Sequence, residues 1–266
     1  MTARKGTALP RPGPSSLAII DQAIARIRPD DEELRGWTKN YFQEHRKRFA
    51  VDLELVARFV PAESLVLDVG AAPYVITTAL QAQAYQVAAV DVNPSRFAAA
   101  ISDLALTVHA CDIECEALPF EDASVDAVLF NELFEHLRID PIHTLEEVYR
   151  VLKPGGLLLL STPNLRSFRG LKNLLLKDQA LSVSGGVYRQ YEKLRTLGHM
   201  GHVREYTTTE TIAFLDQIGF AIEALLYRGG HGRGIVGLAE RLAPSFLPFF
   251  SIVAQRPGQA SGHHGP

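Results

Sequence analysis

The chain has 266 residues, of which 47% are hydrophobic and 21% charged, and its net charge at pH 7 is -3. This composition fits one large globular domain, or one domain with a substantial addition, and excludes a disordered chain. No apolar stretch approaches the roughly 20 residues that cross a bilayer, and the first residues form no apolar leader, so the sequence predicts a cytoplasmic protein without a transmembrane segment. Cys111 and Cys115 are too few for a disulfide framework and are expected to be ordinary thiols.

Charge is distributed unevenly along the chain. Residues 107–148 contain eleven Asp and Glu and one basic residue, Arg138, whereas residues 161–206 contain eight Lys and Arg and three acidic residues. The acidic total argues against nucleic acid as the main partner. The acidic segment could hold a cation and the basic segment could receive an anionic group of a substrate; two solvated faces without ligands are the alternative.

The two ends and the first helical segment precede or follow the main fold. Residues 1–16 and 257–266 are rich in Pro, Gly and Ser and are predicted to be flexible tails. Residues 17–60 have apolar residues at helical spacing and predict an N-terminal helical cap. The aromatic and basic side chains of this cap, Trp37, Tyr41, Phe42 and His45, could close over a substrate together with residues 165–206. The alternative is that Trp37 and Phe42 pack in the core.

Residues 61–256 alternate between short β-branched runs and helical patterns. This order predicts an α/β domain with a doubly wound, mostly parallel, seven-stranded sheet. Five strands are expected at "LVLDVG", "QVAAVDV", "LTVHACDI", "VDAVLF" and "LLLLSTP". A basic, partly helical insertion then covers residues 165–206. The pattern resumes with a helix capped by Thr208 or Thr209 and ends with the strands "AIEALLYRG" and "FFSIVAQRP".

The first strand ends in "LDVGAAPY", where a nucleotide-binding loop is expected. In such a sheet the ligand lies at the carboxyl ends of the strands. Asp68 and Gly70 occupy the positions that such a loop requires, but Ala72 and Tyr74 replace glycines that a pyrophosphate would need. This pattern favours a cofactor without phosphates and ranks a nicotinamide-dependent dehydrogenase last.

Two further acidic residues end the next strands. Asp91 is placed to accept hydrogen bonds from two ribose hydroxyls, and Asp112 is placed to meet the exocyclic amine of an adenine. The alternatives are structural: Asp68 could cap the following helix, and Asp91 could be a turn residue.

The motifs "LDVGAAPY", Asp91, "CDI", "LPF" before "VDAVLF", and "RVLKPGGLLLLSTPN" follow one another along the chain. In these motifs the chain resembles the class I S-adenosylmethionine-dependent methyltransferases, from about Leu65 to Asn164 and again in the last three elements. Tyr74 departs from the family's loop pattern. The resemblance implies a Rossmann-like fold, S-adenosylmethionine as cofactor, and these cofactor-binding residues: Asp68, Gly70, Ala71, Ala72, Tyr74, Asp91, Val92, Asp112, Ile113 and Asn131.

The stretch "FNELFEHL" follows the fourth predicted strand and contains Glu132, Glu135 and His136. Their spacing of i, i+3 and i+4 predicts that all three side chains share one face of a helical turn. Two carboxylates this close repel each other, which raises a pKa or requires a cation. The three residues are therefore a candidate metal-ligand set, with a charged helix start as the alternative.

A later stretch, "HMGHVREYT", adds His199 and His202. Together with E-x-x-E-H and the "PN" after the fifth strand, it is similar to the small-RNA 2'-O-methyltransferases, which bind a divalent metal in this way, and partly to the ubiquinone-pathway O-methyltransferases. The resemblance implies a divalent cation, Mg or Mn, held by Glu132, Glu135, His136 and His202. The fourth ligand could instead be His199, or neither histidine.

The leading hypothesis is an O-methyltransferase that acts on a small-molecule or lipid-linked hydroxylated acceptor. A divalent cation would lower the pKa of the acceptor hydroxyl; without a metal, His136 or His202 could be the general base. The alternatives are an N-, C- or RNA methyltransferase of the same fold, and a non-catalytic cofactor-binding protein.

Overall fold

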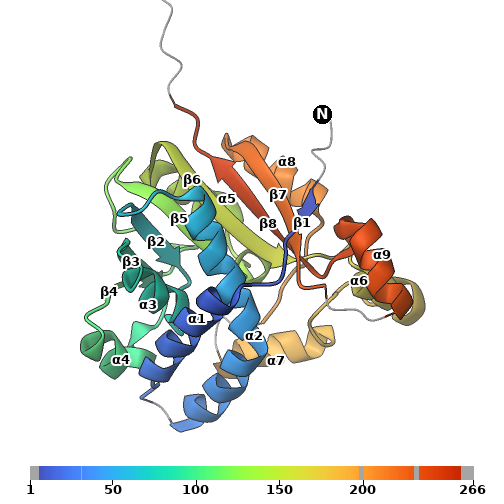
Figure 1. Ribbon diagram of the computed structural model, residues 1–266, viewed down its shortest axis with the longest axis horizontal. Helices are drawn as coiled ribbons and strands as arrows, with labels where there is room; N and C mark the ends of the chain where they lie inside the picture. Colours follow the sequence, from blue (N-terminus) through green and yellow to red (C-terminus); the bar gives the residue numbers. More distant parts are fainter. Residues whose placement is uncertain (1–5, 31, 198–200, 231–233, 259–266) are drawn as a thin grey trace, which may run out of the picture. The chain divides into compact units, whose positions relative to one another are not determined.

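The computed structural model describes residues 6–30, 32–197, 201–230 and 234–258 (Figure 1). The chain divides into two compact units. Unit 1 comprises Met1–Pro10, Phe130–Tyr149 and Pro154–Pro266, and unit 2 comprises Arg11–Leu129 and Arg150–Lys153. The two units are described separately.

Unit 2 contains four parallel strands and the first helices. β2 pairs in parallel with β3 and with β5, and β3 pairs in parallel with β4. The side chains of Leu67, Val90 and Val128 are fully buried between these strands and the helices that cover them. The elements are α1 (Pro14–Arg26), α2 (Glu32–Phe59), β2 (Leu65–Val69), α3 (Val75–Gln81), β3 (Gln86–Asp91), η1 (Pro94–Phe97), α4 (Ala98–Asp103), β4 (Thr107–Ala110) and the start of β5 (Val125–Asn131).

Unit 1 contains the remaining strands and the insertion. β8 pairs antiparallel with both β6 and β7, and β1 pairs in parallel with β7. The elements are β1 (Thr7–Ala8), η2 (Phe134–His136), α5 (Pro141–Val151), β6 (Leu152–Pro163), α6 (Phe168–Lys177), α7 (Val187–Leu197), α8 (Thr208–Ile218), β7 (Ala221–Arg228), α9 (Gly234–Leu242), η3 (Pro244–Phe246) and β8 (Phe249–Gln255); the turn from α5 into β6 belongs to unit 2.

The strands follow the order β1-β7-β8-β6-β5-β2-β3-β4, with hydrogen bonds between neighbours. The prediction of a mostly parallel α/β sheet is therefore confirmed, but the sheet has eight strands. The additional strand, β1, lies in the segment predicted to be a flexible tail, and α1 begins at Pro14. Residues 7–8 form β1 because Thr7 and Ala8 pair with Leu226 and Tyr227, and residues 14–16 begin helix α1.

Two helical segments have the character that the sequence predicts. The cap is two helices, α1 and α2, which pack against each other and against α3. The insertion holds α6 and α7. The helix after it begins one residue earlier than predicted: Thr207 is the cap and forms a reciprocal capping box with Glu210, so neither Thr208 nor Thr209 caps it. Among the described residues, none of the helices has the length and apolar character needed to span a membrane.

Candidate functional site

The loop after β2 in unit 2 folds over the end of β3. The amides of Gly70 and Ala71 both donate to the Val90 carbonyl, at 2.9 and 3.2 Å. Gly70 has a φ of 66°, in the left-handed region that glycine adopts at little cost. The loop therefore turns tightly at the end of β2, held to the neighbouring parallel strand β3.

Asp91 ties this loop to the end of β3. Its Oδ2 accepts a hydrogen bond from the Ala72 amide at 3.1 Å, and its Oδ1 accepts one from the Asn93 amide at 3.0 Å. One such bond on each oxygen leaves further acceptor positions, since a carboxylate offers about four. Next to it, Val92 presents an exposed apolar side chain.

Asp112 and Ile113 follow β4, the strand beside β3. The Cys111 amide donates to the Asp91 carbonyl at 3.0 Å, and the Asp112 carboxylate accepts from the Glu114 amide at 3.2 Å. The side chains of Asp112 and Ile113 are half-buried. The predicted ribose and adenine partners, Asp91 and Asp112, thus follow the carboxyl ends of adjacent parallel strands.

Tyr74 replaces a glycine of the expected loop pattern, and its backbone has the left-handed conformation, with a φ of 66°. Its side chain is completely buried and lies edge-on against Phe97, with 5.7 Å between ring centroids. Burial raises the pKa of the phenol. The ring therefore packs in the interior of unit 2.

Asp68, at the end of β2, is buried and accepts a hydrogen bond from the Thr77 hydroxyl at 2.6 Å. Burial, more than any neighbouring charge, raises the pKa of this carboxyl to about 7. The contact with Thr77 joins the strand to the helix that follows the loop.

We expect Asp68→Asn to stabilise the protein more at pH 8 than at pH 5. A folded-state pKa above the unfolded value means that the native state binds the proton more tightly, so stability falls as pH rises from about 4 to about 7. The amide removes that cost, and the variant should gain a few kcal/mol in unfolding free energy between the two pH values. Urea denaturation measures it, with the exposed Asp103→Asn as control; a gain independent of pH would contradict the expectation.

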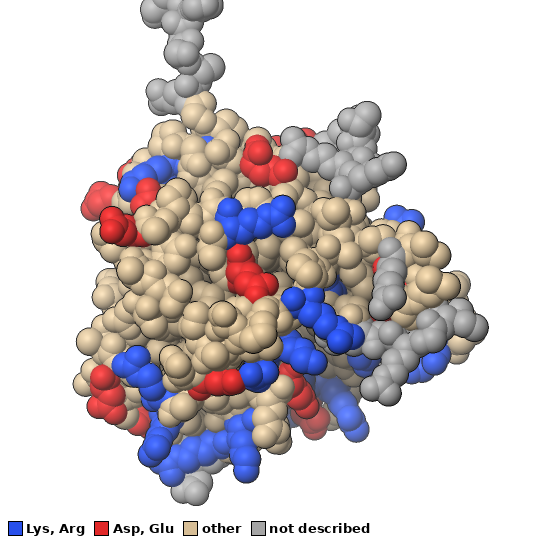
Figure 2. Space-filling view, viewed as in Figure 1, with Lys and Arg blue, Asp and Glu red and all other residues tan. Residues whose placement is uncertain are grey.

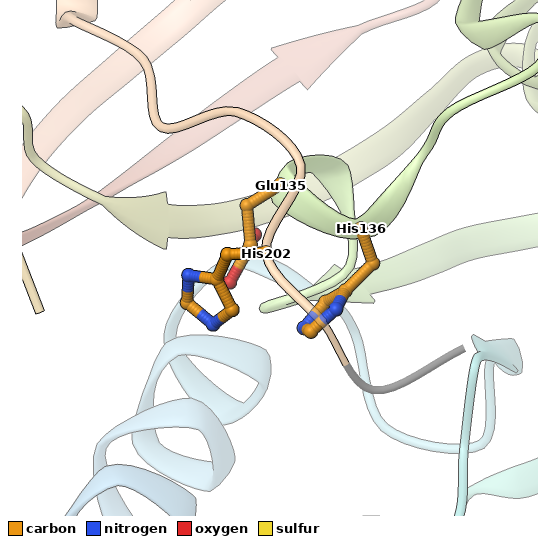
Figure 3. A group of neighbouring side chains, drawn as sticks. All are labelled: Glu135, His136 and His202. Carbon is orange, nitrogen blue, oxygen red and sulfur yellow. The ribbon is translucent and has the colours of Figure 1, made fainter. Parts of the chain in front are cut away.

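The second group of predicted residues comes together in unit 1. Glu135, His136 and His202 offer ligand atoms that all lie within 4.8 Å of one another (Figure 3). η2 supplies the first two residues and the segment before α8 supplies the third. The Val203 amide donates to the Glu135 carbonyl at 2.8 Å, so the backbones of the two segments are joined beside the cluster.

Each imidazole has one nitrogen directed at an oxygen outside the cluster. His136 Nδ1 lies 3.1 Å from the Gly201 carbonyl, and His202 Nδ1 lies 3.4 Å from Glu205 Oε1. An oxygen beside Nδ1 favours the tautomer that is protonated there, which leaves the Nε2 lone pair for a ligand. Both histidines are therefore oriented as metal-binding histidines usually are.

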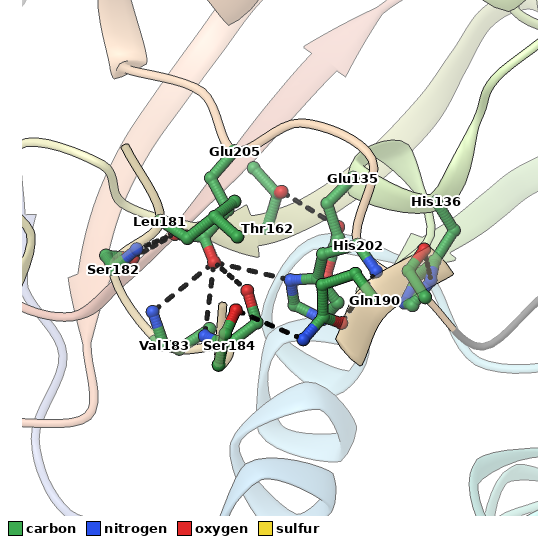
Figure 4. Close-up of polar contacts among 12 residues, drawn as sticks. Glu135, His136, Thr162, Leu181, Ser182, Val183, Ser184, Gln190, His202 and Glu205 are labelled. Atoms are coloured by element: carbon green, nitrogen blue, oxygen red, sulfur yellow. Dashed lines mark hydrogen bonds and ion pairs between the residues drawn. The ribbon is translucent and has the colours of Figure 1, made fainter. Parts of the chain in front are cut away.

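Glu205 is the buried carboxylate behind His202 (Figure 4). It accepts hydrogen bonds from the Ser182 amide and hydroxyl and from the amide and hydroxyl of Ser184. Burial alone would raise the pKa of Glu205, but His202 and the serines outweigh it and lower that pKa to about 2. For His202, burial lowers the pKa of the imidazole, but Glu205 and the charge of Glu135 outweigh burial and leave that pKa above its ordinary value.

Glu135 is fully buried, and Thr162 donates a 2.9 Å hydrogen bond to its Oε2. Its Oε1 has no hydrogen-bond partner within the described part of the chain. Burial, followed by the charge of Glu132, raises the pKa of Glu135 to about 8. A buried carboxyl oxygen without a partner, beside two oriented imidazoles, fits a divalent cation, which would satisfy it and favour the ionised form.

Glu132 does not share the helical face predicted for it. Its backbone has a φ of 51°, and its amide donates to the Ser161 carbonyl of β6 at 2.8 Å. Glu132 therefore lies beside β6, just before the single turn of η2 begins. Its carboxylate accepts from Arg228 at 2.8 Å. The prediction of one continuous helical face was wrong because a left-handed residue separates Glu132 from η2, and the structure places Glu132 in an ion pair outside the cluster.

Two predicted residues remain. Asn131 ends β5 and belongs to unit 1, where the Ser161 hydroxyl donates to its Oδ1 at 3.0 Å. The nine other predicted cofactor residues belong to unit 2. His199 falls outside the described residues. Sequence reasoning missed Glu205, Thr162 and Arg228; the polar letters of "STPN" and "VREYT" were the available signals for the first two.

Comparisons with known proteins agree with this architecture. Residues 67–160 match the family model described as a methyltransferase domain. Over 130 residues the chain is 32% identical to a probable S-adenosylmethionine-dependent methyltransferase of Mycolicibacterium smegmatis, which covers 49% of this chain and 41% of that protein. It is 33% identical over 133 residues to a ubiquinone/menaquinone biosynthesis C-methyltransferase of Geotalea uraniireducens, covering 48% and 52%.

A solved structure shares the fold. It is an S-adenosylmethionine-dependent methyltransferase from Thermotoga maritima described as a possible histamine N-methyltransferase; it matches with a TM-score of 0.54 and 20% identity, over 83% of this chain and 95% of that one. The chain spans about half the length, or less, of the curated relatives it matches.

Proposed function

We propose that this chain, which carries a methyltransferase domain of the class I fold, transfers a methyl group from S-adenosylmethionine to an oxygen of a small or lipid-linked hydroxylated acceptor, assisted by a divalent cation. The observation that carries the metal-assisted part is the cluster of Glu135, His136 and His202, with its ligand atoms within 4.8 Å and one buried carboxyl oxygen without a partner among the described residues.

The residues of unit 2 support the cofactor. Gly70 gives a backbone that a ligand can approach closely, Asp91 keeps acceptor positions for ribose hydroxyls, and Asp112 can accept from an adenine amine. The ring of Tyr74 is buried and so does not project into solvent at the loop. A cofactor without phosphates therefore suits this loop.

Strand β5 begins in unit 2, where it pairs with β2. Leu129 of β5 pairs with Asp68 of β2, so β5 ends at the edge of the sheet where the cofactor loop begins. Glu135 follows six residues later along the chain.

A bound cation would supply Lewis acidity, lowering the pKa of the acceptor hydroxyl. Glu135 and the two imidazoles would fix its place, and Glu205 would hold His202 in the required tautomer. The acceptor oxygen then forms a bond to the methyl carbon as the carbon–sulfur bond breaks, and its proton leaves to a nearby base. Two imidazoles with one carboxylate suit Mn²⁺ or Fe²⁺ better than Mg²⁺, which prefers oxygen ligands.

The helical cap, residues 17–60, and the insertion, residues 165–206, are proposed to cover the acceptor. Trp37 is half-buried and stacks on Tyr41 with 4.5 Å between centroids, so its ring stays partly available. Phe42 is buried and belongs to the core, as the alternative held. Deleting residues 17–45 should therefore raise KM for the acceptor if the chain still folds.

Transfer of labelled methyl from S-adenosylmethionine to mixtures of hydroxylated compounds, with and without a chelator, tests the proposed function. We expect transfer to oxygen that stops on chelation and returns with Mn²⁺. Cofactor binding without any transfer would favour a non-catalytic protein, and transfer to carbon or nitrogen that ignores the chelator would overturn the metal-assisted O-methylation.

We expect Asp91→Ala to weaken S-adenosylmethionine binding by ~1–3 kcal/mol, the cost of losing hydrogen bonds to a charged acceptor. Calorimetry with S-adenosylmethionine and S-adenosylhomocysteine measures both affinities. Asp103→Ala, an exposed acidic residue of the same unit, is the control. Unchanged affinity in the Asp91 variant would remove this residue from the cofactor site.

A further inference from the structure

Helix α6 of the insertion packs on the protein through its small and polar residues and leaves leucines exposed. Gly170 and Asn173 point inward: a Cβ on Gly170 would lie 2.0 Å from the Leu165 carbonyl oxygen, and the Asn173 amide donates to the Leu181 carbonyl at 2.9 Å. Leu175 and Leu176 are 76% and 75% exposed. The helix thus docks on the protein through a small and a polar residue and presents its leucines outward.

The outward leucines form an ordered face. Phe168, Leu171 and Leu175 are spaced i, i+3 and i+7, which aligns them along one side of the helix, and Leu174 lies next to them. Phe168 begins this face and stacks on Phe246 of η3 with 4.9 Å between centroids. Leu171 is half-buried, whereas Leu174 and Leu175 are exposed.

Cations border this apolar face. Arg169, Lys172 and Lys177 are exposed on the same helix. Residues 165–197 contain seven Lys and Arg against Asp178 and Glu192 alone. Figure 2 shows Lys and Arg side chains in blue on the visible face of the molecule.

We propose that α6 docks on the surface of an anionic phospholipid bilayer. An exposed amphipathic helix with leucines on one face and Lys and Arg beside them matches the boundary between acyl chains and anionic headgroups, which accepts both kinds of group at once. A second copy of the chain would bring the same cations against each other, and like charges oppose such pairing. Docking requires neither cofactor nor cation, so this inference stands apart from the proposed methyl transfer.

Sedimentation of the full chain with lipid vesicles tests the inference. We expect binding to vesicles of equal parts phosphatidylcholine and phosphatidylglycerol, and little binding to phosphatidylcholine alone. Lys172→Gln with Lys177→Gln should lower the partition coefficient more than tenfold, at about fivefold for each cation, and added salt should reduce binding of the parent protein.

Leu174→Gln with Leu175→Gln should also lower the partition coefficient, by about tenfold or more, because each leucine would otherwise leave water. Ile142→Gln, at an exposed apolar residue of α5, is the matched control and should bind as the parent does. Circular dichroism and S-adenosylmethionine affinity show whether each variant is folded.

Three results would overturn the inference. The first is equal binding to neutral and anionic vesicles, and the second is the same loss in the Ile142 variant as in the leucine variant. The third is a lipid-free dimer that the leucine substitutions dissociate, which would assign the face to self-association.

Discussion

Replacing Glu135 with glutamine is expected to lower both divalent-cation affinity and methyl-transfer rate by at least about 100-fold, since even the residues that only orient metal ligands are typically worth 10–100-fold. The fold should tolerate the change. The pKa of Glu135 is about 8, so at pH 7 and without a metal the buried carboxyl is largely neutral, and an amide of the same shape can still accept from Thr162. Calorimetry with Mn²⁺ and single-turnover transfer measure the two effects.

Glu146→Gln is the matched control, because Glu146 is exposed on α5 of the same unit. S-adenosylmethionine affinity should stay within about twofold in both variants, since the proposed cofactor residues follow β2, β3 and β4. Full activity of metal-stripped protein, together with a tolerated Glu135→Gln change, would leave His136 or His202 as a general base and end the metal hypothesis.

Glu132→Ala is expected to destabilise the protein by ~3–5 kcal/mol, the typical cost of removing one partner of a buried ion pair. The side chains of Arg228 and Glu132 are only 4% and 9% exposed, so the guanidinium would stay buried after losing its carboxylate. Urea denaturation of metal-free protein measures the loss. Arg228→Met should cost a similar amount.

The double variant Glu132→Ala with Arg228→Met should be more stable than the sum of the two single losses predicts, because neither charge then remains buried. This cycle also separates two roles for Glu132. A metal ligand would lose cation affinity with little change in metal-free stability, whereas the ion pair of the structure predicts the reverse.

The alternation of strands and helices could be predicted because its signals are local. Strands such as "LVLDVG" and "QVAAVDV" combine β-branched runs with a turn residue, and each pairs in parallel as expected. β1 could not be predicted in this way. Thr7 and Ala8 have no strand pattern of their own and form a strand only because the exposed edge of β7 offers them hydrogen-bond partners.

The candidate metal site, too, could be predicted from the sequence only in part. Glu135 and His136 are neighbours in sequence, and His202 was predicted beside them from a resemblance. Glu132 pairs with Arg228, which lies 96 residues away along the chain. Neither that ion pair nor the support of His202 by Glu205 has a spacing that a sequence pattern could reveal, because tertiary packing alone creates them.

The short strand β1 has a consequence for the solution behaviour of the chain. Without it, β7 would be the outermost strand, and its unpaired amides and carbonyls, beside buried Leu226 and Tyr227, would resemble the edges along which sheets of different molecules join. Two residues of a proline- and glycine-rich segment occupy that edge, and Leu9 adds an amide hydrogen bond of 2.7 Å to the Tyr227 carbonyl. Residues 7–9 thus cover the edge of β7, and removing them would expose that edge and lower solubility before it altered any chemistry.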